Sequence, residues 1–162
     1  MADEVYEVGM GDIIIAHNPA TLSIIGLGSC VGVALYSAKD RVGGLAHIML
    51  PDSRRSRPGA NMKKFADTGI SYMLGELKRK GVEPMWLSAR LIGGASMFQL
   101  ADSKSAFNIG QDNVAMCREI LKRERIRIVS EEVLGNKGRT MKFDLVTGKI
   151  IVRYVDGVVR EL

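Results

Sequence analysis

Short runs rich in apolar and β-branched residues, bounded by turn residues, dominate the first third of the chain. The runs that predict strands here are residues 5–8, 12–16, 21–25, 30–36 and 42–50. Along 30–36, the even positions lie on one face and Val31, Val33 and Leu35 on the other, because successive strand side chains alternate. The short loop 37–41 has hairpin chemistry, so 30–36 and 42–50 should pair antiparallel.

Apolar residues at helical spacing follow and predict two helices. Their apolar faces comprise Ala66, Ile70, Met73, Leu74 and Leu77, and then Val114, Cys117, Ile120 and Leu121. The first helix should stop at Gly81, and the second should begin near Asn108 or at 111–112. Further strands are predicted at 85–92, 126–133, 141–146 and 149–155, the last two joined by a turn at 147–148.

This order of elements predicts an α/β fold. Strands outnumber helices, and both helices fall between strands, so we expect a layered domain with a mixed, mainly antiparallel sheet and two main helices. The chain has 162 residues, no internal repeat and no convincing linker, which predicts a single domain over residues 1–162.

Composition narrows the function classes. With 46% hydrophobic and 25% charged residues, the chain is typical of a globular protein. No apolar run approaches the roughly 20 residues of a membrane span, and the acidic N-terminus lacks a signal-peptide pattern, so we expect a cytoplasmic protein without membrane insertion. The net charge of +5 is densest at 53–59, a solvated loop, and aromatics are only 6%, which argues against nucleic acid as a partner.

The segment GLGSCVGVALY at 26–36 raises the question of what Cys30 does. Most free cysteines simply pack in a core. Here, however, the cysteine follows a tight turn that includes Gly28 and Ser29, whose backbone N–H groups could hold an oxyanion. Cys30 is therefore either a core residue or a nucleophile. Two cysteines form no disulfide framework, and with two histidines no metal site is expected.

His47 is the candidate partner of that cysteine. A lone histidine within LAHIML is commonly a hydrogen-bonded core residue, but the predicted hairpin would bring it close to Cys30. An imidazole beside a thiol stabilises the thiolate, which predicts a cysteine pKa below that of a free thiol. Cys117 lies on the apolar face of a helix and is predicted to be core.

A second glycine-rich segment, GGASMF at 93–98, follows a predicted strand. It lacks a phosphate-binding motif. We expect Gly94, Ser96 and Phe98 to contribute to a surface that faces substrate or a partner, because exposed aromatic residues often anchor partners. A buried, purely packing Phe98 is the alternative.

Together these segments resemble the CheD family of chemoreceptor glutamine deamidases. The motifs are GLGSCVGVALY, LAHIMLPDS with its histidine seventeen residues after the cysteine, FADTGI, LIGGASMF, NIGQDN and GNKGRT, in order from about Val8 to Tyr154. The resemblance implies an α/β sandwich similar to the catalytic domain of cytotoxic necrotizing factor toxins. It implies hydrolysis of glutamine side-chain amides on chemoreceptor helices, and of receptor glutamate methyl esters, without a cofactor. The implied partners are the phosphatase CheC and, through it, the response regulator CheY.

The family's nucleophilic cysteine falls on Cys30 and its histidine on His47. The family commonly has a threonine at the position of Ile24, assigned to orient the histidine, and frequently has a glycine at Leu134. Isoleucine accepts no hydrogen bond, so Ile24→Thr should raise the rate unless a backbone carbonyl or water holds the imidazole. Two other hypotheses stay open: a non-catalytic adaptor that binds receptors or CheC, and a thiol redox sensor.

Overall fold

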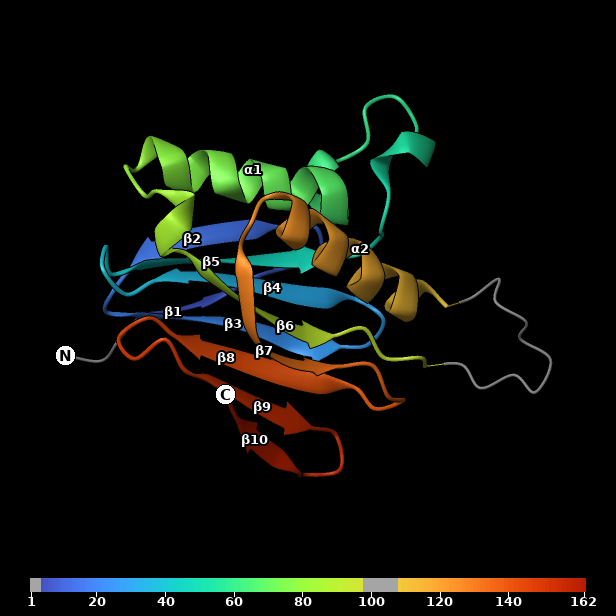
Figure 1. The fold of residues 1–162 in the computed structure, drawn as a ribbon. Coiled ribbons are helices and arrows are strands. Elements are labelled where there is room, and N and C mark those ends of the chain that lie inside the picture. Colours follow the sequence, from blue (N-terminus) through green and yellow to red (C-terminus); the bar gives the residue numbers. More distant parts are fainter. Residues whose placement is uncertain (1–3, 98–107) are drawn as a thin grey trace.

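The computed structural model describes residues 4–97 and 108–162 and arranges them in three layers (Figure 1). Two helices cover one face of a middle sheet, and an outer sheet packs against its other face. The predicted layered α/β sandwich with mixed, mainly antiparallel sheets and two main helices is confirmed. Within the described residues, no helix has the length and apolar character needed to cross a membrane.

The middle sheet has the strand order β2-β5-β4-β6-β7. Its strands are β2 (Ile13–His17), β5 (Val42–Ile48), β4 (Val31–Ser37), β6 (Ser88–Gly93) and β7 (Arg127–Val133). Strands β4 and β5 form the predicted antiparallel hairpin, with Gly32 opposite His47. Strands β6 and β7 are parallel because the chain crosses over through a helix between them.

The outer sheet has the order β1-β3-β8-β9-β10. Its strands are β1 (Glu4–Glu7), β3 (Ala20–Leu27), β8 (Arg139–Asp144), β9 (Ile150–Tyr154) and β10 (Val159–Glu161). Only the β1–β3 pair is parallel among these described strands. Strands β8 and β9 form the predicted hairpin, in which Gly148 N–H donates to Asp144 O at the turn. The strand β10 was not predicted.

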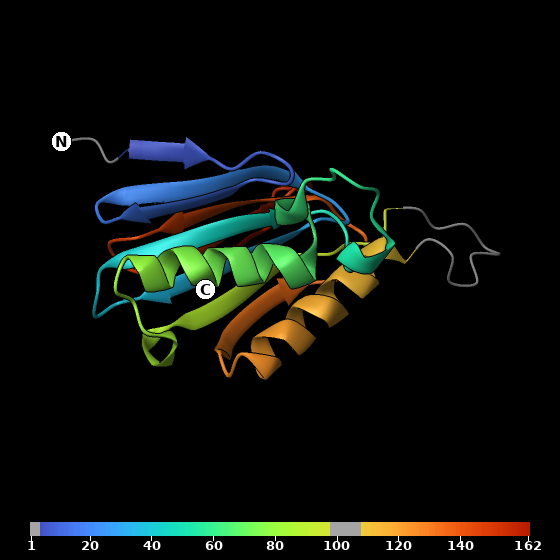
Figure 2. The same ribbon diagram turned by 90° about the horizontal axis from the view of Figure 1, so that it is seen from above.

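Helices α1 (Ala66–Arg79) and α2 (Ile109–Arg123) lie side by side over the middle sheet (Figure 2). Their apolar faces, including Ile70, Met73 and Cys117, are buried against Val31, Val33, Leu35 and other residues of that sheet. Short 3₁₀ helices η1 (Ser53–Arg55) and η2 (Met62–Lys64) precede α1. The second helix begins after Asn108, as one of the two predicted starts required.

A second core lies between the two sheets. Ala34 and Tyr36 of β4 point into it, together with Leu22 and Ile24 of β3. The even and odd positions of β4 thus face different layers, as the alternation predicted. Because the sandwiched middle sheet is covered on both faces, β4 and β5 are buried throughout.

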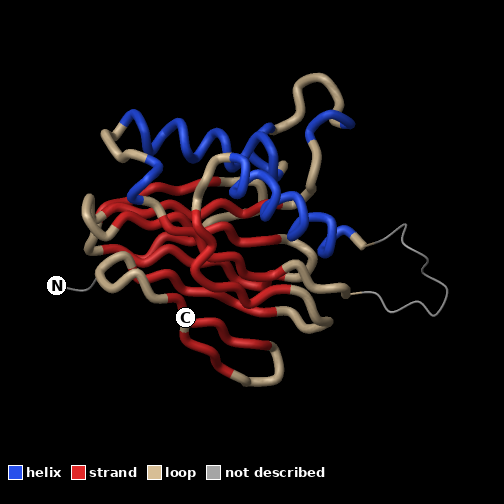
Figure 3. Tube along the Cα trace, viewed as in Figure 1, coloured by secondary structure: helices blue, strands red, loops and turns tan. Residues whose placement is uncertain are grey.

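Several predicted strand boundaries differ from the observed ones, and two of the differences have a clear physical cause. The segment from Met85 does not continue as a strand, because Pro84–Trp86 forms the 3₁₀ helix η3 and the strand starts at Ser88 (Figure 3). Proline has no N–H to offer a sheet and favours the first turn of a helix. Strand β5 ends at Ile48 rather than Leu50, since Leu50 forms an isolated bridge with Phe65.

Candidate active site

Cys30 lies in the short connection between β3 and β4, one residue before β4 begins. Its side chain is half-buried and packs at the border of the core between the sheets. It therefore continues the face of β4 that carries Ala34 and Tyr36. The thiol is neither fully buried nor fully exposed, which leaves it accessible from this edge of the sandwich.

His47 lies on β5, directly opposite Gly32 of β4. In an antiparallel pair, opposite residues point to the same face, so Cys30 and His47 are diagonal neighbours on one face of the sheet. Diagonal neighbours are separated by about 7–8 Å, within reach of an imidazole ring. Gly32 lies between them along the strand, and the outer sheet packs closely on it: a Cβ there would lie 2.5 Å from Met141 Sδ.

A backbone carbonyl orients the imidazole. His47 Nδ1 lies 3.0 Å from Val8 O in the connection between β1 and β2. Because a carbonyl oxygen can only accept, Nδ1 carries the hydrogen and Nε2 carries the lone pair. The main chain of His47 is held by the same connection: its N–H donates to Asp12 O and its carbonyl accepts from Gly11 N–H, each at 3.0 Å.

Burial keeps both members of the pair neutral in the free protein. It raises the pKa of the Cys30 thiol. It also lowers the pKa of His47, an effect that the bond to Val8 O partly opposes. The prediction of a lowered cysteine pKa is therefore wrong for the free protein, because a buried neutral imidazole supplies no positive charge to stabilise a thiolate. Such a pair can exchange a proton during a reaction rather than before it.

The turn before Cys30 has its carbonyls occupied. Gly28 O accepts from Ala95 N–H at 2.9 Å, Cys30 O accepts from Gly94 N–H at 2.8 Å, and Ser29 O accepts from the Asn113 side chain at 3.0 Å. Within residues 4–97 and 108–162, the N–H groups of Ser29 and Cys30 donate to no acceptor. Free N–H groups beside a thiol are what a developing oxyanion requires.

Comparison with known proteins identifies the family. The family model described as CheD chemotactic sensory transduction matches residues 49–154. The Desulforamulus reducens protein named probable chemoreceptor glutamine deamidase CheD is 50% identical over 149 residues, 92% of this chain and 90% of that protein. The chain belongs to the CheD family. A Clostridium tetani protein with the same name is 43% identical over 157 residues, 97% of this chain and 95% of that protein.

Among solved structures, a hypothetical Bacillus licheniformis protein, YfiH, aligns with this CheD family member at a TM-score of 0.49 and 14% sequence identity. The alignment covers 82% of this chain and 60% of that chain.

The GGAS segment, residues 93–96, hydrogen-bonds to the turn that carries Cys30. Gly94 is buried with φ +67, and a Cβ there would collide with Val114 of α2. The expectation that Gly94 lies on a partner-facing surface is therefore wrong. Ser96 is half-buried, and its N–H donates to Gly135 O. Phe98 lies outside the described residues.

Leu134, where the resemblance to CheD led us to expect a glycine, adopts a backbone conformation that suits glycine. It has φ +70, a conformation that glycine adopts without steric cost and leucine does not. Its N–H donates to Gly93 O, which ties this loop to the segment behind Cys30.

Cys117 of α2 is fully buried between the helices and the middle sheet, as predicted. Burial raises the pKa of its thiol to about 12. It therefore remains a neutral core residue, in contrast to the half-buried Cys30.

Ile24 is fully buried in the core between the sheets. A Cβ on Gly32 would lie 3.2 Å from Ile24 Cδ1, so the isoleucine packs beside the strand position opposite His47. Since Val8 O already accepts from Nδ1, the imidazole does not need a hydroxyl at this position.

We therefore expect Ile24→Thr to leave the rate of the proposed reaction within about twofold. It should lower the free energy of unfolding by roughly 2 kcal/mol, because it removes apolar volume and buries a hydroxyl. Urea unfolding and turnover of the two proteins measure both effects, with Ile24→Val as the control that keeps an apolar side chain. A clear rise in turnover would mean that a threonine hydroxyl still improves the histidine's position.

The lowered pKa of His47 predicts a specific pH dependence of stability. The unfolded chain binds a proton at this residue below about pH 6.5, whereas the folded protein resists it, so acidification favours unfolding in this range. The contribution levels off below the folded pKa. Between about pH 7.5 and 5, the melting temperature of wild type should fall more than that of His47→Asn. The control is His17→Gln, which removes an exposed histidine at the end of β2.

Sequence reasoning missed two groups of this site. Val8 acts through its carbonyl, which leaves no signal in a side-chain pattern. Asn113 is fully buried on α2, one turn before Cys117 and on the same face. The sequence did contain a signal for Asn113: it is a polar residue among the apolar residues on one face of the predicted helix.

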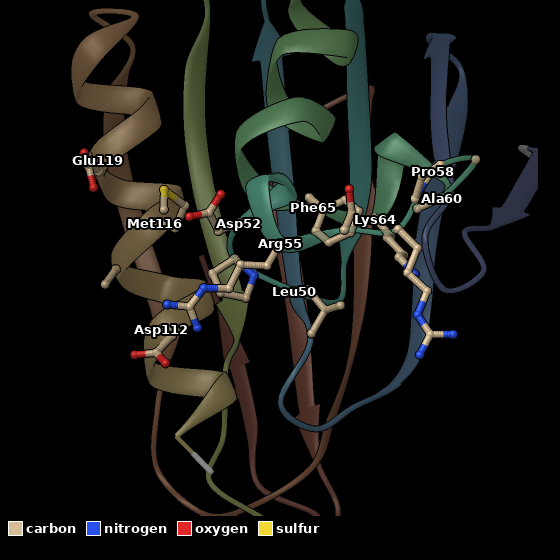
Figure 4. Close-up of a pocket in the computed structure, with 15 residues that line it drawn as sticks. Leu50, Asp52, Arg55, Pro58, Ala60, Lys64, Phe65, Asp112, Met116 and Glu119 are labelled. Atoms are coloured by element: carbon tan, nitrogen blue, oxygen red, sulfur yellow. The ribbon is translucent and has the colours of Figure 1, made fainter. Parts of the chain in front are cut away.

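A cavity of about 970 Å³ lies between the segment 50–60 and α2 (Figure 4). Leu50, Phe65 and Met116 contribute apolar surface, while Arg55 and Asp112 bring charges of both signs. Neither Cys30 nor His47 lines it. The cavity is on the helix side of the middle sheet, whereas the thiol faces the outer sheet, so it has no part in the chemistry proposed below.

Proposed function

We propose that this protein hydrolyses the side-chain amides of glutamine residues on chemoreceptors, which converts these residues to glutamate and releases ammonia. The relatives at 50% and 43% identity carry the name probable chemoreceptor glutamine deamidase. The observation that supports the proposal is that half-buried Cys30 precedes β4 beside the β5 residue His47, whose Nδ1 lies 3.0 Å from Val8 O. The arrangement leaves Nε2 as a base on the face of the sheet shared with the thiol.

In the first half of the reaction, His47 Nε2 takes the Cys30 proton as sulfur attacks the glutamine carbonyl carbon. The resulting oxyanion accepts hydrogen bonds from the Ser29 and Cys30 N–H groups. The imidazolium then gives its proton to the leaving nitrogen. Ammonia departs and a thioester remains on Cys30.

In the second half, His47 removes a proton from a water molecule, which attacks the thioester. The tetrahedral intermediate collapses to glutamate, and the sulfur recovers its proton from the imidazolium. The sum is one water consumed and one ammonia released per glutamine. A glutamate methyl ester would react by the same steps, with methanol as the leaving group.

The proposal is tested by incubating the protein with soluble cytoplasmic fragments of chemoreceptors from the same organism and mapping the peptides by mass spectrometry. Each deamidated glutamine gains about 1 Da, because NH₂ is replaced by OH. A non-catalytic adaptor would bind the fragments without a mass change. If the folded protein binds the fragments but leaves them unmodified, the hydrolysis hypothesis is rejected and the adaptor hypothesis is favoured.

We further propose the partners that CheD family membership implies: the phosphatase CheC and, through it, CheY. We also propose a cytoplasmic location, because the substrate helices proposed here belong to the cytoplasmic part of chemoreceptors. Co-elution of the purified protein with CheC in size-exclusion chromatography tests the first partner. Two separate peaks at concentrations well above those in the cell would contradict it.

A further inference from the structure

Asn113 connects three parts of the molecule that bear on the thiol. It lies on α2 and is fully buried. Its Nδ2 donates both hydrogens, one to Ser29 O and one to Met49 O, each at 3.0 Å. Ser29 directly precedes the thiol residue, and Met49 follows His47 by two positions. One amide group therefore holds together the turn that carries Cys30 and the end of the strand that carries His47.

The bond to Ser29 O has a consequence for the neighbouring N–H. Ser29 C=O and Cys30 N–H belong to one planar, trans peptide unit and point in opposite directions. A donor that fixes the carbonyl therefore fixes the direction of the Cys30 N–H as well. Ala95 N–H does the same for the preceding unit, since it holds Gly28 O and so directs the Ser29 N–H.

A purely structural role fits the residue poorly. Among the described residues, Asn113 Oδ1 is buried without a hydrogen-bond partner. Leaving a buried acceptor unpaired costs free energy that an apolar side chain of similar size would not. What the asparagine supplies, and an apolar residue could not, is the pair of donors on the two carbonyls.

We propose that Asn113 is a positioning residue for the amide hydrolysis: by fixing Ser29 O, it directs the Cys30 N–H toward the developing oxyanion. The inference rests on the proposed function. It predicts that loss of the Asn113 donors slows acylation more than it affects substrate binding, because the oxyanion exists only after attack.

The test compares wild type with Asn113→Leu, which has similar size and no donor, and Asn113→Ser, which keeps one shorter donor. For Asn113→Leu we expect kcat on receptor fragments to fall by about 10²-fold while KM changes by less than about threefold. Asn113→Ser should lose about tenfold, and it also serves if Asn113→Leu does not fold. Cys117→Ala is the matched control, because it lies on the same face of α2 but contacts neither carbonyl.

Alkylation of Cys30 by iodoacetamide distinguishes a positioning role of Asn113 from a purely structural role. This displacement reaction forms no oxyanion, so its rate should stay within about twofold in the variants that lose kcat. Equal falls in alkylation and turnover, or folded variants with wild-type kcat, would overturn the inference while leaving the proposed function intact. If wild type itself shows no deamidation, the proposed function fails and the inference fails with it.

Discussion

Replacing Cys30 with alanine is expected to reduce receptor deamidation by at least about 10³-fold, because no other group in the turn can form the thioester. The fold should survive. The turn is held by its three carbonyls, which accept from Ala95, Asn113 and Gly94, and the half-buried thiol contributes little packing. Turnover is measured by ammonia release and peptide mapping, and the melting temperature should stay within about 2 °C of wild type.

Cys117→Ala provides the matched comparison for this experiment. The second cysteine is fully buried, so its truncation should lower the free energy of unfolding by about 1–2 kcal/mol. Below its melting transition, this variant should turn over at close to the wild-type rate. If Cys30→Ala retained more than about a tenth of the activity, the nucleophile would have to be another group.

His47→Asn is expected to reduce turnover by about 10²–10⁴-fold, the usual contribution of a general base. Asparagine Nδ2 can occupy the place of the imidazole Nδ1 and still donate to Val8 O, so the connection between β1 and β2 should remain in place. The variant has no counterpart of Nε2, and only that function is removed.

The pH profile distinguishes this loss from a packing defect. Wild-type kcat/KM should fall on acidification as His47 of the free protein becomes protonated, below the usual histidine pKa because burial lowers it. The residual activity of His47→Asn should lack this limb. If His47→Asn were fully active, or if its activity still fell on acidification as in wild type, His47 would have no part in the mechanism.

The strands that carry the site follow from local patterns. Alternation along 30–36 and the short loop after it were sufficient to predict the β4–β5 hairpin. Because opposite residues in a hairpin share a face, the proximity of Cys30 and His47 also followed from sequence. The burial of Cys117 came from helical spacing in the same way.

Features that depend on long-range packing did not follow. The Val8 carbonyl reaches His47 only because β1 pairs parallel with β3 in the outer sheet, which no local pattern indicates. Gly94 is buried because α2 packs against the segment after β6. The direction of the Cys30 pKa was wrong because sequence proximity to a histidine says nothing of how both groups are desolvated.

The Cys30 sulfur is expected to attack the side chain of a receptor glutamine. The most direct test uses a receptor-derived peptide in which a mapped target glutamine is replaced by a diazoketone analogue, which alkylates a thiol placed at the side-chain carbonyl. After digestion, mass spectrometry should find the covalent adduct on the peptide that contains Cys30, and not on that containing Cys117. A Cys30 that remains unmodified while the same preparation deamidates receptor fragments would contradict the account.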